Sequence, residues 1–127
     1  MGTNGDDPKK GETNAHNVED GDILVVGSDG LWDNMHRHKI VSLVGRFTRE
    51  TPVIKDMGLV AEMIAKEAEK LSYLSNHMSP FAESARAHNY DYIGGKPDDI
   101  TVIVAQIQLK NSKEQVWIFV FLFNEIL

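Results

Sequence analysis

Two short runs of apolar, β-branched residues stand out from the rest of the chain, and each adjoins a turn that contains aspartate. The first run lies in residues 22–28 and begins the stretch ILVVGSDGLWDNM, residues 23–35, in which the turn SDG ends it. The second run, ITVIVAQIQL, fills residues 100–109 and follows the turn GGKPDD. Apolar runs of this length that are bounded by glycine and aspartate are typical of buried strands. We therefore predict a strand in each of these segments.

Between the two predicted strands, apolar residues recur at helical spacing. The first helix is predicted in residues 34–47, and a longer one begins at Asp56 as its cap and runs to about residue 74. A short helix is predicted after Ser79, which can cap it, because Pro80 suits the first helical position. The order of elements in this part is therefore strand, helix, helix, a short helix and strand.

The two ends of the chain differ from this central part and from each other. Residues 1–20 are polar and lack the apolar core of a signal peptide and the arginine-rich character of a transit peptide, so we expect a polar arm without a targeting segment. The apolar run from residue 116 to 123 is too short to span a bilayer, which takes about 20 residues. We expect a strand there that needs a partner. The predicted division is thus 1–20, 21–110 and 111–127.

Composition narrows the classes of function. The chain has 127 residues, 42% of them hydrophobic, which suits one small domain with a core. It has no cysteine, so disulfides, thiolate zinc sites and cysteine nucleophiles are excluded. The net charge is −6, and the basic residues form no stripe interleaved with aromatic residues. We expect a monomer that binds no nucleic acid and does not span a membrane.

The two aspartate turns lie next to the two predicted strands. Asp29 follows the first strand and Asp98 precedes the last one, so antiparallel pairing of these strands would bring both carboxylates to one edge of a sheet. Carboxylate oxygens on short turns suit hard divalent cations such as Mg²⁺ or Mn²⁺. The alternative is that both aspartates are turn residues that accept hydrogen bonds from their own backbone, and spacing alone favours this interpretation.

Three further residues close to Asp29 are interpreted as structural rather than functional. His36 and His38 are two positions apart, and on a helix such a pair does not share a face, so we interpret them as solvated surface residues rather than a metal site. Trp32 lies beside the end of a predicted strand, where its large apolar surface favours a place in the core.

The two motifs together resemble a known family. GDILVVGSDGLWDNM and GGKPDDITVIV are similar to the last two metal-binding motifs of the metal-dependent protein phosphatases, the type 2C serine/threonine phosphatases, and MSPFAESA followed by GGKPDDITV resembles their mitochondrial and plastid branch. By this resemblance Asp29 and Asp98 match metal-ligand aspartates, Gly30 is a turn residue, and Asp99 replaces a more common asparagine. The resemblance implies an α+β fold, part of an α-β-β-α sandwich with antiparallel sheets packed face to face and helices outside.

The resemblance also implies an activity. Two Mn²⁺ or Mg²⁺ ions would supply a hydroxide for hydrolysis of phosphoserine or phosphothreonine in a phosphorylated protein. The family also uses an early Asp-Gly-x-Gly-Gly motif, an upstream acidic residue and an arginine that binds phosphate, none of which is found in this sequence. The chain thus looks like the carboxyl-terminal half of such a phosphatase, with part of the active site and no activity by itself.

Two other classes of protein are considered. A phosphatase of the haloacid dehalogenase type also places an aspartate after an apolar strand, but it needs a second aspartate two positions later, where this chain has Leu31. The other alternative is a catalytically inactive fragment or interaction module of the phosphatase fold. The sequence upstream of Met1 in the gene would distinguish this alternative from a split phosphatase.

Overall fold

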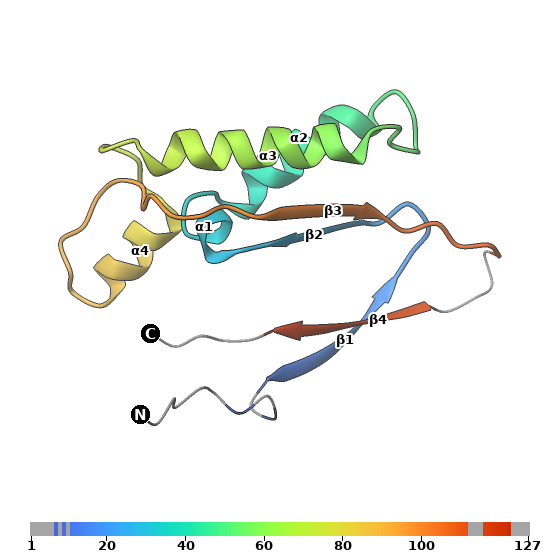
Figure 1. The fold of residues 1–127 in the computed structure, drawn as a ribbon, viewed down its shortest axis with the longest axis horizontal. Helices are drawn as coiled ribbons and strands as arrows, with labels where there is room; N and C mark the ends of the chain where they lie inside the picture. Colours follow the sequence, from blue (N-terminus) through green and yellow to red (C-terminus); the bar gives the residue numbers. More distant parts are fainter. Residues whose placement is uncertain (1–6, 8, 10, 112–115, 123–127) are drawn as a thin grey trace. The chain divides into compact units, whose positions relative to one another are not determined.

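A computed structural model describes residues 7, 9, 11–111 and 116–122 of the chain, the last seven by their backbone alone. Along the described residues two strands are followed by four helices and then by two more strands, and the strands pair antiparallel, which confirms the predicted α+β class (Figure 1). The chain divides into two compact units, a central one from Ile23 to Gln106 and one made of its two end segments. No helix among the described residues is long and apolar enough to cross a membrane.

The sheet of the central unit has two strands, β2 (Ile23–Gly27) and β3 (Val102–Gln106). They pair antiparallel, with Ile23 opposite Gln106 and Gly27 opposite Val102. Both strands lie within the segments predicted from the apolar runs, and the antiparallel pairing on which the metal-site hypothesis depends is confirmed. The reason is local, since β-branched residues fit the pleated, half-buried surface of a sheet.

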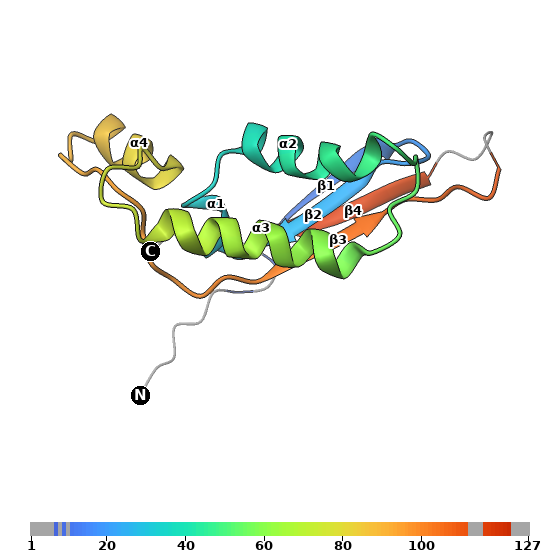
Figure 2. The same ribbon diagram turned by 90° about the horizontal axis from the view of Figure 1, so that it is seen from above.

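Four helices complete the central unit: α1 (Asp29–Trp32), α2 (Arg37–Thr48), α3 (Met57–Ser72) and α4 (Pro80–Ala87). Helices α2 and α3 lie over one face of the β2–β3 sheet (Figures 1 and 2). The caps predicted for two helices are confirmed: the Asp56 carboxylate accepts a hydrogen bond from the Leu59 amide at 2.9 Å, and the Ser79 hydroxyl accepts one from the Ala82 amide at 3.0 Å.

The predicted start of the first helix is wrong. A helix was predicted over residues 34–47, but the chain forms the short helix α1 first and then begins α2 at Arg37. His36 is the N-cap residue of α2 and makes no capping hydrogen bond with its side chain. The apolar periodicity identified the buried face of α2 and could not locate the break before it.

The core lies between the helices and the sheet. Leu31, Val60 and Ile64 are completely buried, and partly buried residues of both strands pack against this cluster. Trp32 is 37% exposed, so its predicted place in the core is wrong. Because α1 directs the Leu31 side chain into the core, the side chain of the next residue, Trp32, is partly exposed.

The end unit is a two-stranded antiparallel sheet. Strand β1 (Glu12–Val18) pairs with β4 (Val116–Leu122), from Glu12 opposite Leu122 to Val18 opposite Val116. The expected strand in the apolar tail is thereby confirmed, whereas a strand in the polar arm was not expected. Strand β1 is polar and exposed, and its backbone supplies the hydrogen-bonding partner that an apolar strand requires.

Candidate metal centre

The two aspartates predicted as metal ligands lie at the same end of the β2–β3 sheet. Gly27 and Val102 form the last pair of the ladder at this end. Asp29 is the first residue of α1, two positions beyond β2, and Asp98 precedes β3 by four positions. The topology thus places the two turns that carry these residues beside each other.

Ser28 joins the two turns directly. Its hydroxyl donates a hydrogen bond to the backbone carbonyl of Asp99 at 3.0 Å and accepts one from the Thr101 amide at 3.0 Å. The Ser28 amide donates to the Thr101 carbonyl, also at 3.0 Å. These bonds extend the cross-strand connection beyond the end of the ladder, so the segment that leads to Asp29 and the segment that follows Asp98 are held together.

An ammonium group lies among the carboxylates of this region. Lys96 Nζ is 2.9 Å from Asp33 Oδ2 and 3.7 Å from Asp98 Oδ2, and it lies 5.0 Å from the centre of the Phe81 ring. The hydrogen bond to Asp33 raises the pKa of Lys96, and the charges of Asp33, Asp29 and Asp98 add to this effect. Lys96 is therefore a cation at neutral pH, and it offsets part of the negative charge at this end of the sheet.

The two candidate ligands differ in their own hydrogen bonds. Asp98 Oδ1 accepts a bond from the Asp99 amide at 2.8 Å, as the turn interpretation expects. Within the described part of the chain, no hydrogen bond or ion pair to the Asp29 carboxylate is found, so this interpretation does not account for Asp29. An ionised carboxylate has about four lone-pair positions, so the bond at Asp98 leaves others for a ligand.

The donor set suits a hard cation but is small. Mg²⁺ is usually held by one or two carboxylates together with water, and Mn²⁺ also prefers oxygen donors. Asp29 and Asp98 would supply such donors. Among the described residues, no three His, Asp or Glu side chains are grouped so that they could hold a metal ion. These two aspartates therefore fit part of a divalent-cation site.

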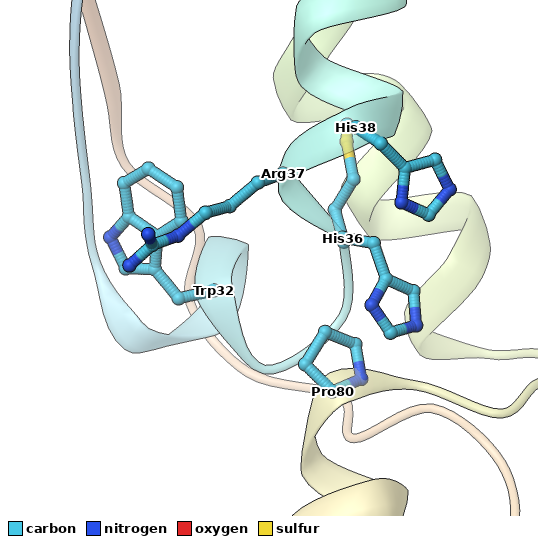
Figure 3. Close-up of a pocket in the computed structure, with 6 residues that line it drawn as sticks. Trp32, His36, Arg37, His38 and Pro80 are labelled. Atoms are coloured by element: carbon cyan, nitrogen blue, oxygen red, sulfur yellow. The ribbon is translucent and has the colours of Figure 1, made fainter.

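A pocket of about 450 Å³ lies beside the carboxyl end of α1. Trp32, Met35, His36, Arg37, His38 and Pro80 line it. Figure 3 shows the side chain of Arg37 extending toward the Trp32 ring, while the His36 and His38 rings lie next to each other. The Trp32 Nε1–H donates a hydrogen bond to the Gly27 carbonyl at 2.9 Å, which holds the indole against the end of β2.

The premise that His36 and His38 do not share a face is wrong. Their rings stack with centroids 5.4 Å apart. The rule for spacing on a helix does not apply to them because His36 lies before α2, in extended conformation. His36 Nε2 is 3.0 Å from the Met78 carbonyl, so the nitrogen is a donor and this bond fixes the ring.

Comparisons with known proteins connect this arrangement with one enzyme family, although no protein-family model matches the chain. The protein phosphatase PTC7 homolog fig of Drosophila ananassae is 35% identical over 107 residues, which are 82% of this chain and 31% of that protein. The probable protein phosphatase 2C 55 of Arabidopsis thaliana is 35% identical over 114 residues, which are 90% of this chain and 23% of that protein.

A solved phosphatase structure is also similar to this chain. The photosystem II phosphatase PBCP superposes with a TM-score of 0.60 at 34% sequence identity, over 72% of this chain and 38% of that one. The chain spans about a third of the length of the PTC7 relatives it matches. By sequence and by fold, this chain is therefore homologous, over 23% to 38% of their length, to the PTC7-type and type 2C protein phosphatases.

Proposed function

We propose that this chain supplies part of the active site of a metal-dependent protein serine/threonine phosphatase, with Asp29 and Asp98 as ligands of Mn²⁺ or Mg²⁺. The observation that supports this most directly is the antiparallel β2–β3 pair, since it brings the two aspartate turns to one edge of the sheet. The Ser28 hydrogen bonds support it further by joining the turns.

The role of the protein groups in this proposal is to hold and orient. Ions bound by Asp29 and Asp98 would supply a hydroxide at neutral pH by lowering the pKa of bound water. The carboxylates themselves do not attack phosphorus. Lys96 lies beside Asp98 and offsets part of the negative charge at this end of the sheet. The proposed substrate is a protein that carries phosphoserine or phosphothreonine.

We further propose that residues 21–110 are the phosphatase part of the chain, and that the isolated chain hydrolyses phosphopeptides negligibly. Two carboxylates are too few to fix a pair of ions, and the early motif that the family uses is not in this sequence. Residues 1–20 and 111–127 would lie outside the phosphatase part. A mitochondrial or plastid location belongs to the same proposal and is tested by imaging a fluorescent fusion.

The test is Mn²⁺-dependent hydrolysis of a phosphoserine peptide by this chain and by a chimaera that joins it to the amino-terminal part of a PTC7 relative. We expect turnover only in the chimaera, with loss of activity in its Asp29→Asn and Asp98→Asn variants. Asp91→Asn is the matched control, because Asp91 is a fully exposed aspartate whose nearest cation is Arg86, at 3.8 Å. Robust turnover by the 127 residues alone would contradict the partial-site proposal. An inactive chimaera with bound Mn²⁺ would favour an interaction module.

A further inference from the structure

Asn34 connects the two aspartate turns from inside the protein. Its side chain is completely buried, two residues after α1. Its Nδ2 group donates hydrogen bonds to the Gly30 carbonyl at 2.9 Å and to the Lys96 carbonyl at 2.7 Å, and its Oδ1 accepts a bond from the Lys96 amide at 2.7 Å. One amide group thus bonds to two backbone segments that are more than 60 residues apart in sequence.

Both segments carry a candidate metal ligand. Gly30 directly follows Asp29, and Lys96 precedes Asp98 by two residues. The amide group is planar and rigid, its side chain is completely buried, and all its bonds are made to backbone atoms; hydrogen bonds of buried groups are strong. The carbonyl of Asn34 itself accepts a hydrogen bond from His77 Nε2 at 2.9 Å, which holds the backbone of Asn34 in place.

We propose that Asn34 is a positioning residue that sets the separation of the Asp29 and Asp98 carboxylates and thereby the affinity of this edge for a divalent cation. The inference rests on the proposed metal role of these aspartates. Asparagine suits the position because it donates two bonds and accepts one at the same time. Aspartate would keep the acceptor and lose both donors, and alanine would remove the side-chain partner of the buried Gly30 carbonyl and of the half-buried Lys96 amide and carbonyl.

The chain offers a matched control at the opposite end of the β2–β3 sheet. The Gln106 side-chain amide also bridges a loop, since its Nε2 donates to the Pro52 carbonyl at 2.7 Å and its Oε1 accepts from the Ile54 amide at 2.9 Å. Gln106→Ala therefore removes hydrogen bonds of the same kind from the same unit without touching the segments of Asp29 and Asp98.

The experiment is a Mn²⁺ titration of the full chain, followed by the electron paramagnetic resonance of free Mn²⁺, at a temperature where every variant is folded. We expect Asn34→Ala and Asn34→Asp to weaken Mn²⁺ binding by about 10- to 100-fold, the usual effect of removing a group that orients a ligand. Gln106→Ala should bind Mn²⁺ like the wild-type chain. Unchanged affinity in Asn34→Ala, or an equal loss in Gln106→Ala, would overturn the inference.

A second measurement separates this inference from the proposed function. If Asp29→Asn leaves Mn²⁺ uptake unchanged, Asp29 is not a metal ligand. Hydrogen exchange of backbone amides then tests, without any metal, whether Asn34 holds the Lys96 segment. Faster exchange at Lys96 in Asn34→Ala, with the Thr101 amide still protected by Ser28, would support the positioning role. Unchanged protection of the Lys96 amide would show that Asn34 does not hold this segment, and the inference would be wrong.

Discussion

Gly30 packs directly against the backbone carbonyl of Asp99. A Cβ on Gly30 would overlap this oxygen and would also meet the Ile100 side chain at 3.1 Å. The contact joins helix α1 to the turn that contains Asp98, so the glycine in the SDG motif is required by this close approach between two segments and not only by the turn in which it lies.

Gly30→Ala should therefore lower the free energy of unfolding by about 1–3 kcal/mol, the usual cost of overpacking a buried contact. Gly45→Ala is the control, because Gly45 lies within α2 and an added methyl group there would meet open space. Alanine at this position should stabilise the helix by about 0.5–1 kcal/mol. Urea unfolding followed by circular dichroism measures both. Equal stabilisation by the two substitutions would show that the Asp99 turn moves away without cost.

Trp32→Phe should lower stability by about 0.5–1.5 kcal/mol, because it removes the hydrogen bond to the Gly27 carbonyl and keeps most of the apolar contact. Ile64→Ala, at a fully buried position, should cost more, about 2–5 kcal/mol. Thermal unfolding of both variants checks this order. A loss at Trp32→Phe as large as that at Ile64→Ala would indicate that the indole is part of the core.

The ion pair between α2 and α3 should make stability depend on pH. Lys39 Nζ lies 2.6 Å from Glu67 Oε1, and this hydrogen bond lowers the pKa of Glu67. A lowered folded-state pKa means that the stabilisation is present above the unfolded-state pKa and is lost as pH falls through the folded-state value. Because both side chains are partly exposed, we expect Glu67→Gln to cost about 0.2–1 kcal/mol at neutral pH.

Unfolding by urea at pH 7 and at pH 3 measures this difference, which should be smaller at the lower pH. Glu50→Gln is the control, since Glu50 is exposed and forms no ion pair within the described residues; a surface change of this kind stays within about 0.5 kcal/mol. A constant difference between Glu67→Gln and the wild type across this range would contradict the predicted linkage.

Deletion of residues 111–127 should reduce aggregation and leave the central unit folded. The deletion removes β4, whose sequence VWIFVFL combines β-branched and aromatic residues without charge, a composition that favours aggregation. A sheet of only two strands is marginally stable in water, so its loss should cost little. Sedimentation velocity and thermal unfolding provide the measurements. Loss of the cooperative unfolding transition would show that the central unit depends on β4.

Local sequence determined much of this protein. The β-branched runs specified β2 and β3, and Asp56 and Ser79 marked the starts of α3 and α4, because strand preference and helix capping depend on residues only a few positions apart. The placement of Asp29 and Asp98 at one edge also followed from the sequence once antiparallel pairing was assumed. Their role as metal ligands stays a prediction.

Only the tertiary structure decided how the segments meet. The exposure of Trp32 and the stacking of His36 on His38 depend on the break between α1 and α2, which apolar periodicity does not locate. The bonds of Asn34 to Lys96 join residues 62 positions apart. The polar segment Glu12–Val18 forms strand β1 by pairing with β4. Such contacts depend on which distant backbone groups fold into reach, and a single side chain in the sequence does not specify its distant partner.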